Sequence, residues 1–320
     1  MVYRFVRNTE RDQAMSDEPI NRWHEYALLG CLALLWGSSY LFIDIAVQEL
    51  PPVTLVAIRV VVAAIFLLAV IAWKGIKLPR DTQTWGYLFV QSVLNSSGAW
   101  VLLAWGQQYI DSGLASVLNS TAPLLVFFIT FFITRHEATN PLRLVGAMCG
   151  LLGVILIVGP NVLQGLGQQV AGQFAALAGA MMYGCAAIFG KRFSHLPAAA
   201  TATATILWAV VCVVPASLII DQPWNLSPSP RALIAAIVLG IFCTGLAMLI
   251  YFRLLRTLGS LGVTSQGYLR AGVGVMLGVI VLGEQISPVV GIGLVAALIG
   301  VALINLPPRQ APSETSPINR

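Results

Sequence analysis

The feature that most constrains the fold is a succession of apolar runs of about 20 residues, with most charges confined to the short segments between them. A helix rises about 1.5 Å per residue, so each run is long enough to cross the hydrocarbon of a bilayer. Because that hydrocarbon holds no water, the backbone of each run must pair with itself. Only 10% of the 320 residues are charged, and strand-like alternation is absent. The sequence therefore predicts an all-α membrane protein.

Ten runs qualify as transmembrane helices, and many of the links between them contain Pro or Gly. The first five are predicted near residues 25–47, 52–73, 84–105, 113–134 and 141–158, and the second five near 172–190, 199–220, 231–255, 262–282 and 287–305. We expect a cytoplasmic tail over 1–24 without a cleavable signal, an external linker over 160–171, and a disordered cytoplasmic tail over 307–320.

The basic residues predict the orientation of these helices. If the N-terminus is cytoplasmic, 15 of the 18 Lys and Arg residues fall on that side, and only Arg231 falls on the other. Arg59 and Arg270 lie within predicted helices. Short loops rich in Lys and Arg stay in the cytoplasm. Both termini are therefore expected on the cytoplasmic side of a bacterial inner membrane. The net charge of +5 then reflects topology and the anionic inner leaflet, and nucleic-acid binding is not expected.

The two halves of the chain match each other at a constant separation of 147 residues. The most informative match is Glu137-x-x-x-Pro141 with Glu284-x-x-x-Pro288, at a predicted helix junction. Other matches are Trp36-Gly37 with Tyr183-Gly184, Ser97-Gly98 with Thr244-Gly245, Asn119 with Gln266, and Gly153-Val154 with Gly300-Val301. Because five helices is an odd number, the second half is expected to enter the membrane upside down. Inverted repeats are typical of secondary carriers, whose substrate site lies near the midplane between the halves.

Several of these segments resemble the EamA-type transporters of the drug/metabolite transporter superfamily. The resemblance rests on Trp36-Gly37-Ser38-Ser39-Tyr40, Leu118-Asn119-Ser120-Thr121-Ala122-Pro123, Tyr251-Phe252-Arg253 and Leu282-Gly283-Glu284. It implies one EamA repeat over 25–159, a second over 172–306, and export of amino acids, other metabolites or drugs. The chain departs from the family in two places. Relatives often have lysine where this chain has Asp44, and an aliphatic residue followed by Pro where it has Arg270-Ala271.

Arg270 is the principal candidate for substrate binding. It is predicted near the middle of the membrane, where a charge is costly unless it is paired or lines water. Gln266 lies four residues earlier and thus on the same helix face. The functional interpretation is a guanidinium that receives a carboxylate or phosphate in a cavity. The alternative is a salt bridge that locks the halves together.

A second charged pair is predicted between Asp44 and Arg59, on adjacent antiparallel helices. A structural ion pair and a gate are both compatible with that spacing. Glu137 and Glu284 are predicted at the membrane interfaces, where capping or topology is the expected role.

Polar and aromatic side chains at middle depth complete the predicted site, because such groups should face protein or water rather than lipid. Helix–helix hydrogen bonding is the alternative role. The full set of predicted substrate-binding residues is Trp36, Tyr40, Gln91, Asn95, Asn119, Gln266, Tyr268 and Arg270.

The predicted function is a secondary transporter that exports a small anionic or zwitterionic metabolite, such as an amino acid, by alternating access. A multidrug or cation exporter is the alternative within transport, although it would usually need a carboxylate at mid-membrane. A non-transporting receptor or scaffold is the alternative from another class. The five cysteines form no CxxC, and no nucleophile–base pair, phosphate loop or metal spacing occurs. We therefore expect no enzyme, cofactor or metal. The expected partners are a small-molecule substrate and the bilayer, and the expected state is a monomer or homodimer.

Overall fold

The computed structural model describes residues 22–110, 117–131, 141–158, 169–270, 272–273 and 288–306, except for the side chains of Tyr40, Asp44 and Val158. This part of the chain is helical and contains no strand, which confirms the all-α prediction for it. Seven of its helical segments are long and apolar enough to cross a membrane, and two shorter apolar helices accompany them. Parts of the predicted fourth and ninth spans, with Glu137 and Glu284, lie outside the described residues.

Both halves follow the same order of helices. The first half contains α2 (Arg22–Val47), α3 (Pro52–Lys74), α4 (Thr82–Ser92), the π-helical turn η1 (Val93–Ser97), α5 (Gly98–Gly106), α7 (Ala122–Ile129) and α8 (Pro141–Val158). The second half contains α9 (Val170–Gly190), η4 (Lys191–Phe193), α10 (Ala198–Ile220), η5 (Pro223–Asn225), α11 (Pro230–Gly240), the π-helical turn η6 (Ile241–Leu246), α12 (Ala247–Thr257), α13 (Gly259–Thr264) and α15 (Pro288–Asn305).

Local sequence signals set several helix ends. α3 begins at Pro52, whose fixed φ suits the first helical turn, and it ends before Gly75, which adopts the left-handed conformation at φ 65°. The helix predicted from residue 84 begins two residues earlier, because the Asp81 side chain accepts a hydrogen bond from the Thr84 backbone N–H at 2.7 Å.

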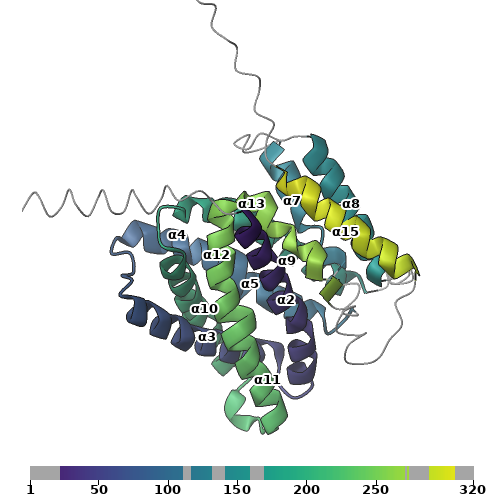
Figure 1. Cartoon of the computed structure of the whole chain (residues 1–320). Helices are drawn as coiled ribbons and strands as arrows, with labels where there is room; N and C mark the ends of the chain where they lie inside the picture. The colour runs from purple at the N-terminus through teal and green to yellow at the C-terminus, as the bar shows by residue number, and fades with distance from the viewer. Residues whose placement is uncertain are drawn as a thin grey trace, which may run out of the picture.

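The halves pack against each other with pseudo-two-fold symmetry, seen most directly between α8 and α15 (Figure 1). Gly146 lies against Gly300, and Gly153 lies against Gly293, so the two helices run antiparallel. A shift of 147 residues converts the first contact into the second. The same exchange relates the contact of α2 with α11 and α12 to the contact of α9 with α4 and α5. Corresponding helices that pack antiparallel are what an inverted repeat requires.

A π-helical turn interrupts the third helix of each half at a corresponding position. In η1 the Ser97 hydroxyl donates to the Ser92 carbonyl oxygen at 3.2 Å. In η6 the Thr244 hydroxyl donates to the Leu239 carbonyl oxygen at 2.9 Å. Both bonds span five residues and are related by the same shift of 147. Single π-turns of this kind often occur at functional sites because they free backbone groups for other partners.

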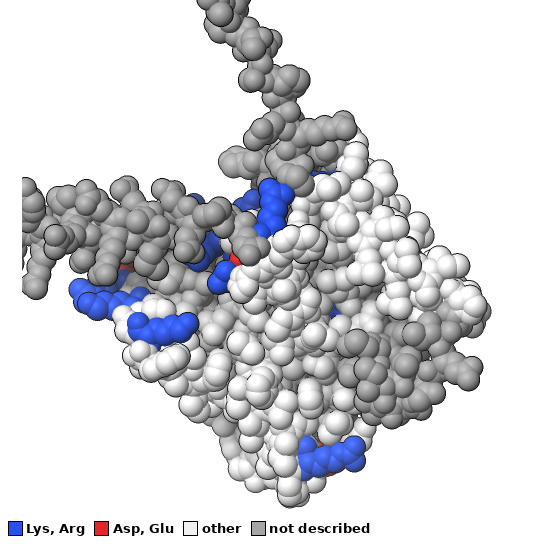
Figure 2. Space-filling model, in the orientation of Figure 1, with Lys and Arg blue, Asp and Glu red and all other residues white. Residues whose placement is uncertain are grey.

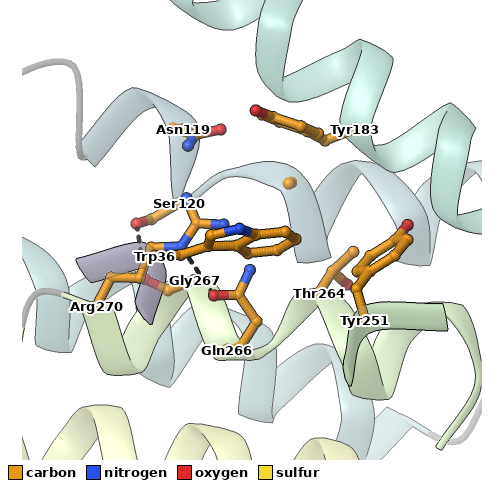
Figure 3. A pocket seen from close by; sticks show the side chains of 10 residues that line it. Trp36, Asn119, Ser120, Tyr183, Tyr251, Thr264, Gln266, Gly267 and Arg270 are labelled. Carbon is orange, nitrogen blue, oxygen red and sulfur yellow. Dashed lines mark hydrogen bonds between the residues drawn. The ribbon is translucent and has the colours of Figure 1, made fainter. Parts of the chain in front are cut away.

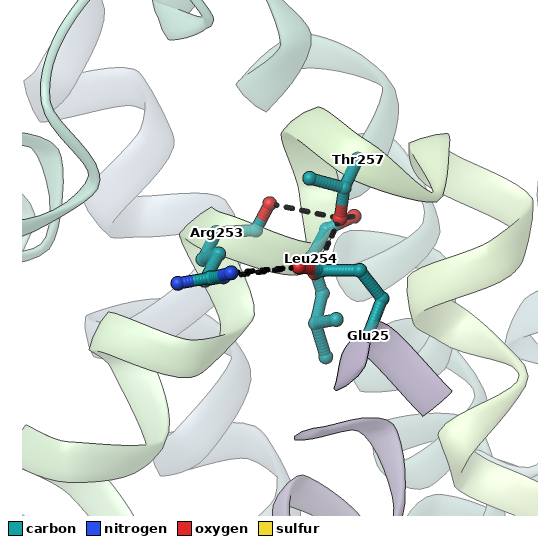
Figure 4. Close-up of polar contacts among 4 residues, drawn as sticks. All are labelled: Glu25, Arg253, Leu254 and Thr257. Atoms are coloured by element: carbon teal, nitrogen blue, oxygen red, sulfur yellow. Dashed lines mark hydrogen bonds and ion pairs between the residues drawn. The ribbon is translucent and has the colours of Figure 1, made fainter. Parts of the chain in front are cut away.

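Polar contacts between the halves occur at both ends of the helix bundle. At one end Glu25, on α2, accepts hydrogen bonds from Arg253 at 2.8 Å and from the Thr257 hydroxyl at 2.8 Å (Figure 4). At the other end Glu49 accepts from the Ser229 backbone N–H at 2.6 Å and from the Ser229 hydroxyl at 2.7 Å. These bonds lower the pKa of the Glu49 carboxyl below its usual range.

The molecular surface between these ends is almost uncharged on the face shown in Figure 2. Large apolar side chains are exposed on several helices, for example Leu152 on α8 and Ile292 and Leu298 on α15. Such an apolar belt with charges at its edges is the arrangement that a bilayer stabilises. The chain is therefore a multi-pass membrane protein.

Candidate substrate site between the halves

Two adjoining chambers lie between the halves. The inner chamber is lined mainly by aromatic and neutral polar side chains (Figure 3). The outer chamber reaches Ile43, Leu55 and Gln107, next to the chain turns at the end of the bundle opposite Glu25. Four residues line both chambers, namely Trp36, Asn119, Tyr183 and Arg270. The chambers therefore adjoin at these four side chains and together form the candidate site.

The inner chamber lies on the pseudo-symmetry axis of the molecule. Trp36 on α2 and Tyr183 on α9 are repeat-related, and so are Asn119 before α7 and Gln266 after α13. All four line this chamber. A site built from corresponding residues of both halves can open to either side of the membrane as the halves move. Alternating access needs this geometry.

Arg270 breaks this symmetry with a charge. Its guanidinium lies 4.8 Å from the centre of the Trp36 ring, and its Nε donates to Gln266 Oε1 at 2.8 Å (Figure 3). Trp36 is itself held in place, because its indole N–H donates to the Cys243 carbonyl oxygen at 3.0 Å, within the π-helical turn η6. The ring and the amide orient the guanidinium but leave its charge uncompensated.

Arg59 brings a second guanidinium to the outer chamber. It is buried on α3, its Nε donates to the Thr244 hydroxyl oxygen at 2.5 Å, and its Nη2 lies 3.5 Å from the Cys243 carbonyl oxygen. The guanidinium lies 4.0 Å from the centre of the Trp100 ring. Among the residues whose side chains the structure describes, no carboxylate lines either chamber. The site therefore presents two cations, each against a tryptophan, with neutral amides and hydroxyls around them.

The structure brings together five of the predicted site residues, Trp36, Arg59, Asn119, Gln266 and Arg270. The pairing of Arg270 with Gln266 on one helix face is confirmed by their hydrogen bond. The side chains of Tyr40 and Asp44 lie outside the described residues, so the predicted pair of Asp44 with Arg59 stays a prediction.

Three other predicted site residues lie outside both chambers, contrary to the predicted lining role. Tyr268 is fully buried against α8, where its ring lies over Gly150 and its hydroxyl donates to the Ala147 carbonyl oxygen at 2.9 Å. Gln91 and Asn95 are buried beside α9 and α12. The Asn95 amide nitrogen lies 3.4 Å from the Met248 sulfur, and Gln91 has no hydrogen-bond partner among the described residues. Their helices present them to neighbouring helices instead of to the cavity.

Sequence reasoning missed several groups that shape the site, above all Thr244, Cys243, Trp100, Tyr183 and Tyr251. The constant separation of 147 residues could have pointed to two of them. It pairs Tyr183 with Trp36 and Thr244 with Ser97. Tyr251 lies in a segment that carries the family resemblance, whereas no comparable sequence signal marks Trp100, which enters the site through packing alone.

Comparison with known proteins agrees with this architecture. The model of the EamA-like transporter family matches residues 24–159 and again residues 170–306. The chain is 29% identical over 282 residues to the uncharacterized inner membrane transporter YedA of Escherichia coli K12, covering 88% of this chain and 90% of that one. It is 25% identical over 232 residues to the uncharacterized transporter YoaV of Bacillus subtilis 168, covering 72% and 79% of the two chains.

A solved crystal structure shares the fold, with a TM-score of 0.72 at 19% identity, over 89% of this chain and 98% of the other. The two family matches correspond to the two halves that pack around the site, and both relatives are transporters by name, YedA an inner membrane one. This chain therefore belongs to the EamA-like transporter family.

Proposed function

We propose that this membrane transporter carries a small anionic or zwitterionic metabolite, such as an amino acid, outward by alternating access between its halves. In this proposal ten spans form two inverted five-helix repeats, and both termini are cytoplasmic. The observation that carries the proposal is the position of Arg270, a half-buried cation in a cavity between the halves.

The alternative role for Arg270, a salt bridge between the halves, lacks a partner in the described part of the chain. The contacts of the guanidinium there are the neutral Gln266 amide and the Trp36 ring. A cation in a low-dielectric site attracts an anion strongly, and a guanidinium binds a carboxylate or phosphate through two parallel hydrogen bonds. A substrate anion is the partner that this arrangement fits best.

Substitution of Arg270 tests the proposal. Arg270→Lys keeps the charge but loses the two-point geometry, so it should retain weak transport of the same substrate. Arg270→Leu should fold, because the family usually has an apolar residue here, and it should lose roughly 1.5–3 kcal/mol of anion binding. The measurements are thermal stabilisation of the purified protein by anions and uptake into liposomes. Wild-type binding and transport by Arg270→Leu would exclude the anion site, whereas failure of this variant to fold would favour the salt bridge.

A further inference from the structure

The second guanidinium of the site restricts the class of substrate further. Arg59 and Arg270 come from different halves of the chain, and both line the outer chamber. Each is placed by contacts that are neutral. Arg59 contacts the Thr244 hydroxyl and the Trp100 ring, and Arg270 contacts Gln266 and the Trp36 ring. A hydroxyl, an amide and a ring face each orient a guanidinium without cancelling its charge.

Two like charges in one cavity repel each other, and the repulsion is strong where little water screens it. Since no carboxylate among the described side chains lines the chamber, a bound monoanion would neutralise only one of the two cations. A ligand with two anionic groups would neutralise both, and each group would gain a guanidinium donor. Both guanidinium groups belong to the lining of the outer chamber, so one ligand bound there has both of them as neighbours.

We infer that the substrate is a compact organic dianion that places one anionic group at Arg270 and the other at Arg59. The inference rests on the proposed function and deepens it. The outer chamber also has aliphatic lining, from Leu55, Val56, Leu103 and Leu239, beside the neutral polar Ser39, Gln107 and Asn119. That lining suits a short hydrocarbon linker between the two anionic groups.

The test compares dianions with monoanions of the same length. Purified protein is titrated with malonate, succinate, glutarate and adipate, and with the matching monoamides, in which one carboxylate is an uncharged amide. Thermal stabilisation gives an apparent Kd for each compound. One or two of the dicarboxylates should bind at least about tenfold tighter than their own monoamides, the scale of one charge-assisted contact.

Arg59→Gln should remove this preference, so that dicarboxylate and monoamide bind alike through Arg270, and Arg59→Lys should retain part of it. The matched control is Arg192→Gln, because Arg192 also lies over an aromatic ring, that of Tyr87 at 4.1 Å, but lines neither chamber. This control should keep the wild-type preference. A purely structural role of Arg59 would lower the melting temperature of the ligand-free variant and leave the ratio of the two Kd values unchanged.

The outcomes separate the inference from the function on which it rests. If the wild type binds dicarboxylates and monoamides equally, the substrate is not a dianion. If Arg270→Leu also loses this binding, the proposal of an anion transporter still holds. A preference that persists in Arg59→Gln would overturn the role of Arg59. Failure of every compound in both series to stabilise wild type would overturn the dianion and the anion site together.

Discussion

Thr244 uses one hydroxyl for two contacts that connect the backbone to the site. The hydroxyl donates to the Leu239 carbonyl oxygen inside the π-helical turn η6, and it accepts from Arg59 Nε. The residue is fully buried. Its counterpart Ser97 makes the same bond within η1, to the Ser92 carbonyl oxygen. The hydroxyl bond in η6 thus also positions Arg59, whereas the corresponding bond in η1 involves only its own helix.

The contact of Thr244 with Arg59, which Ser97 does not make, can be tested by matched substitutions of the two residues. Thr244→Val removes only the hydroxyl that holds Arg59, and we expect it to weaken anion binding about tenfold, in line with roughly 1–2 kcal/mol for a bond to a charged group. Ser97→Ala removes the corresponding hydroxyl and should leave anion binding unchanged. The measurement is the apparent Kd of the anion that most stabilises the wild type. Equal effects of the two changes would show that Thr244 acts only through its helix.

At the scale of elements, glycines determine how closely α8 and α15 approach. A Cβ at Gly300 would lie 2.5 Å from the Gly150 backbone nitrogen, and one at Gly153 would lie 2.5 Å from the Ala297 backbone nitrogen. The two contacts are related by the shift of 147 residues. Since lipid tails give helices no hydrophobic reason to associate, close backbone packing of small residues supplies the attraction.

Alanine substitutions along α15 test this contact. Gly300→Ala should destabilise the folded protein by about 1–3 kcal/mol, because the added methyl group forces the helices apart. Gly291→Ala makes the same chemical change on the same helix, where no atom lies within 4 Å, and it should not lower stability. Melting temperatures of the purified variants in one detergent provide the comparison. If both variants have the same melting temperature, α8 and α15 do not pack closely.

At the scale of the whole molecule, the halves meet around a cavity whose two ends differ. Glu25, Arg253 and Thr257 join α2 to α12 at one end, while the outer chamber extends toward the other. An inverted repeat can exchange these roles, because each half can adopt the arrangement now held by the other. The proposed orientation places the Glu25 end in the cytoplasm, where most basic residues are predicted.

Reporter fusions test that orientation. Fusions after Arg80, Arg192 and Arg309 should report a cytoplasmic position, because basic residues in short loops are retained inside. Fusions after Gln164 and Gln222 should report an external position. Fluorescence of a reporter that folds only in the cytoplasm marks the cytoplasmic positions, and activity of a periplasmic phosphatase marks the external ones. A cytoplasmic position for Gln164 would contradict the inverted arrangement of the halves.

The sequence by itself determined the features that follow from the spacing of residues along the chain. The lengths of the apolar runs predict spans, Pro52 is both the predicted and the observed start of α3, and the four-residue spacing puts Arg270 and Gln266 on one helix face. The constant separation of 147 residues predicts the repeat. Each of these features is a property of neighbouring residues or of a repeated pattern, so it is readable without the fold.

Only the tertiary structure decided which faces meet the cavity. A membrane helix is apolar on nearly all sides, so its sequence carries little amphipathic pattern to distinguish lipid, neighbouring helices and cavity. For that reason Tyr268 and Gln91 were misplaced, and the two contacts that position Arg59, with Thr244 and Trp100, were missed. The Thr244 contact joins residues 185 positions apart in the chain. Such contacts depend on how helices rotate and pack, and that is settled by the assembled bundle as a whole.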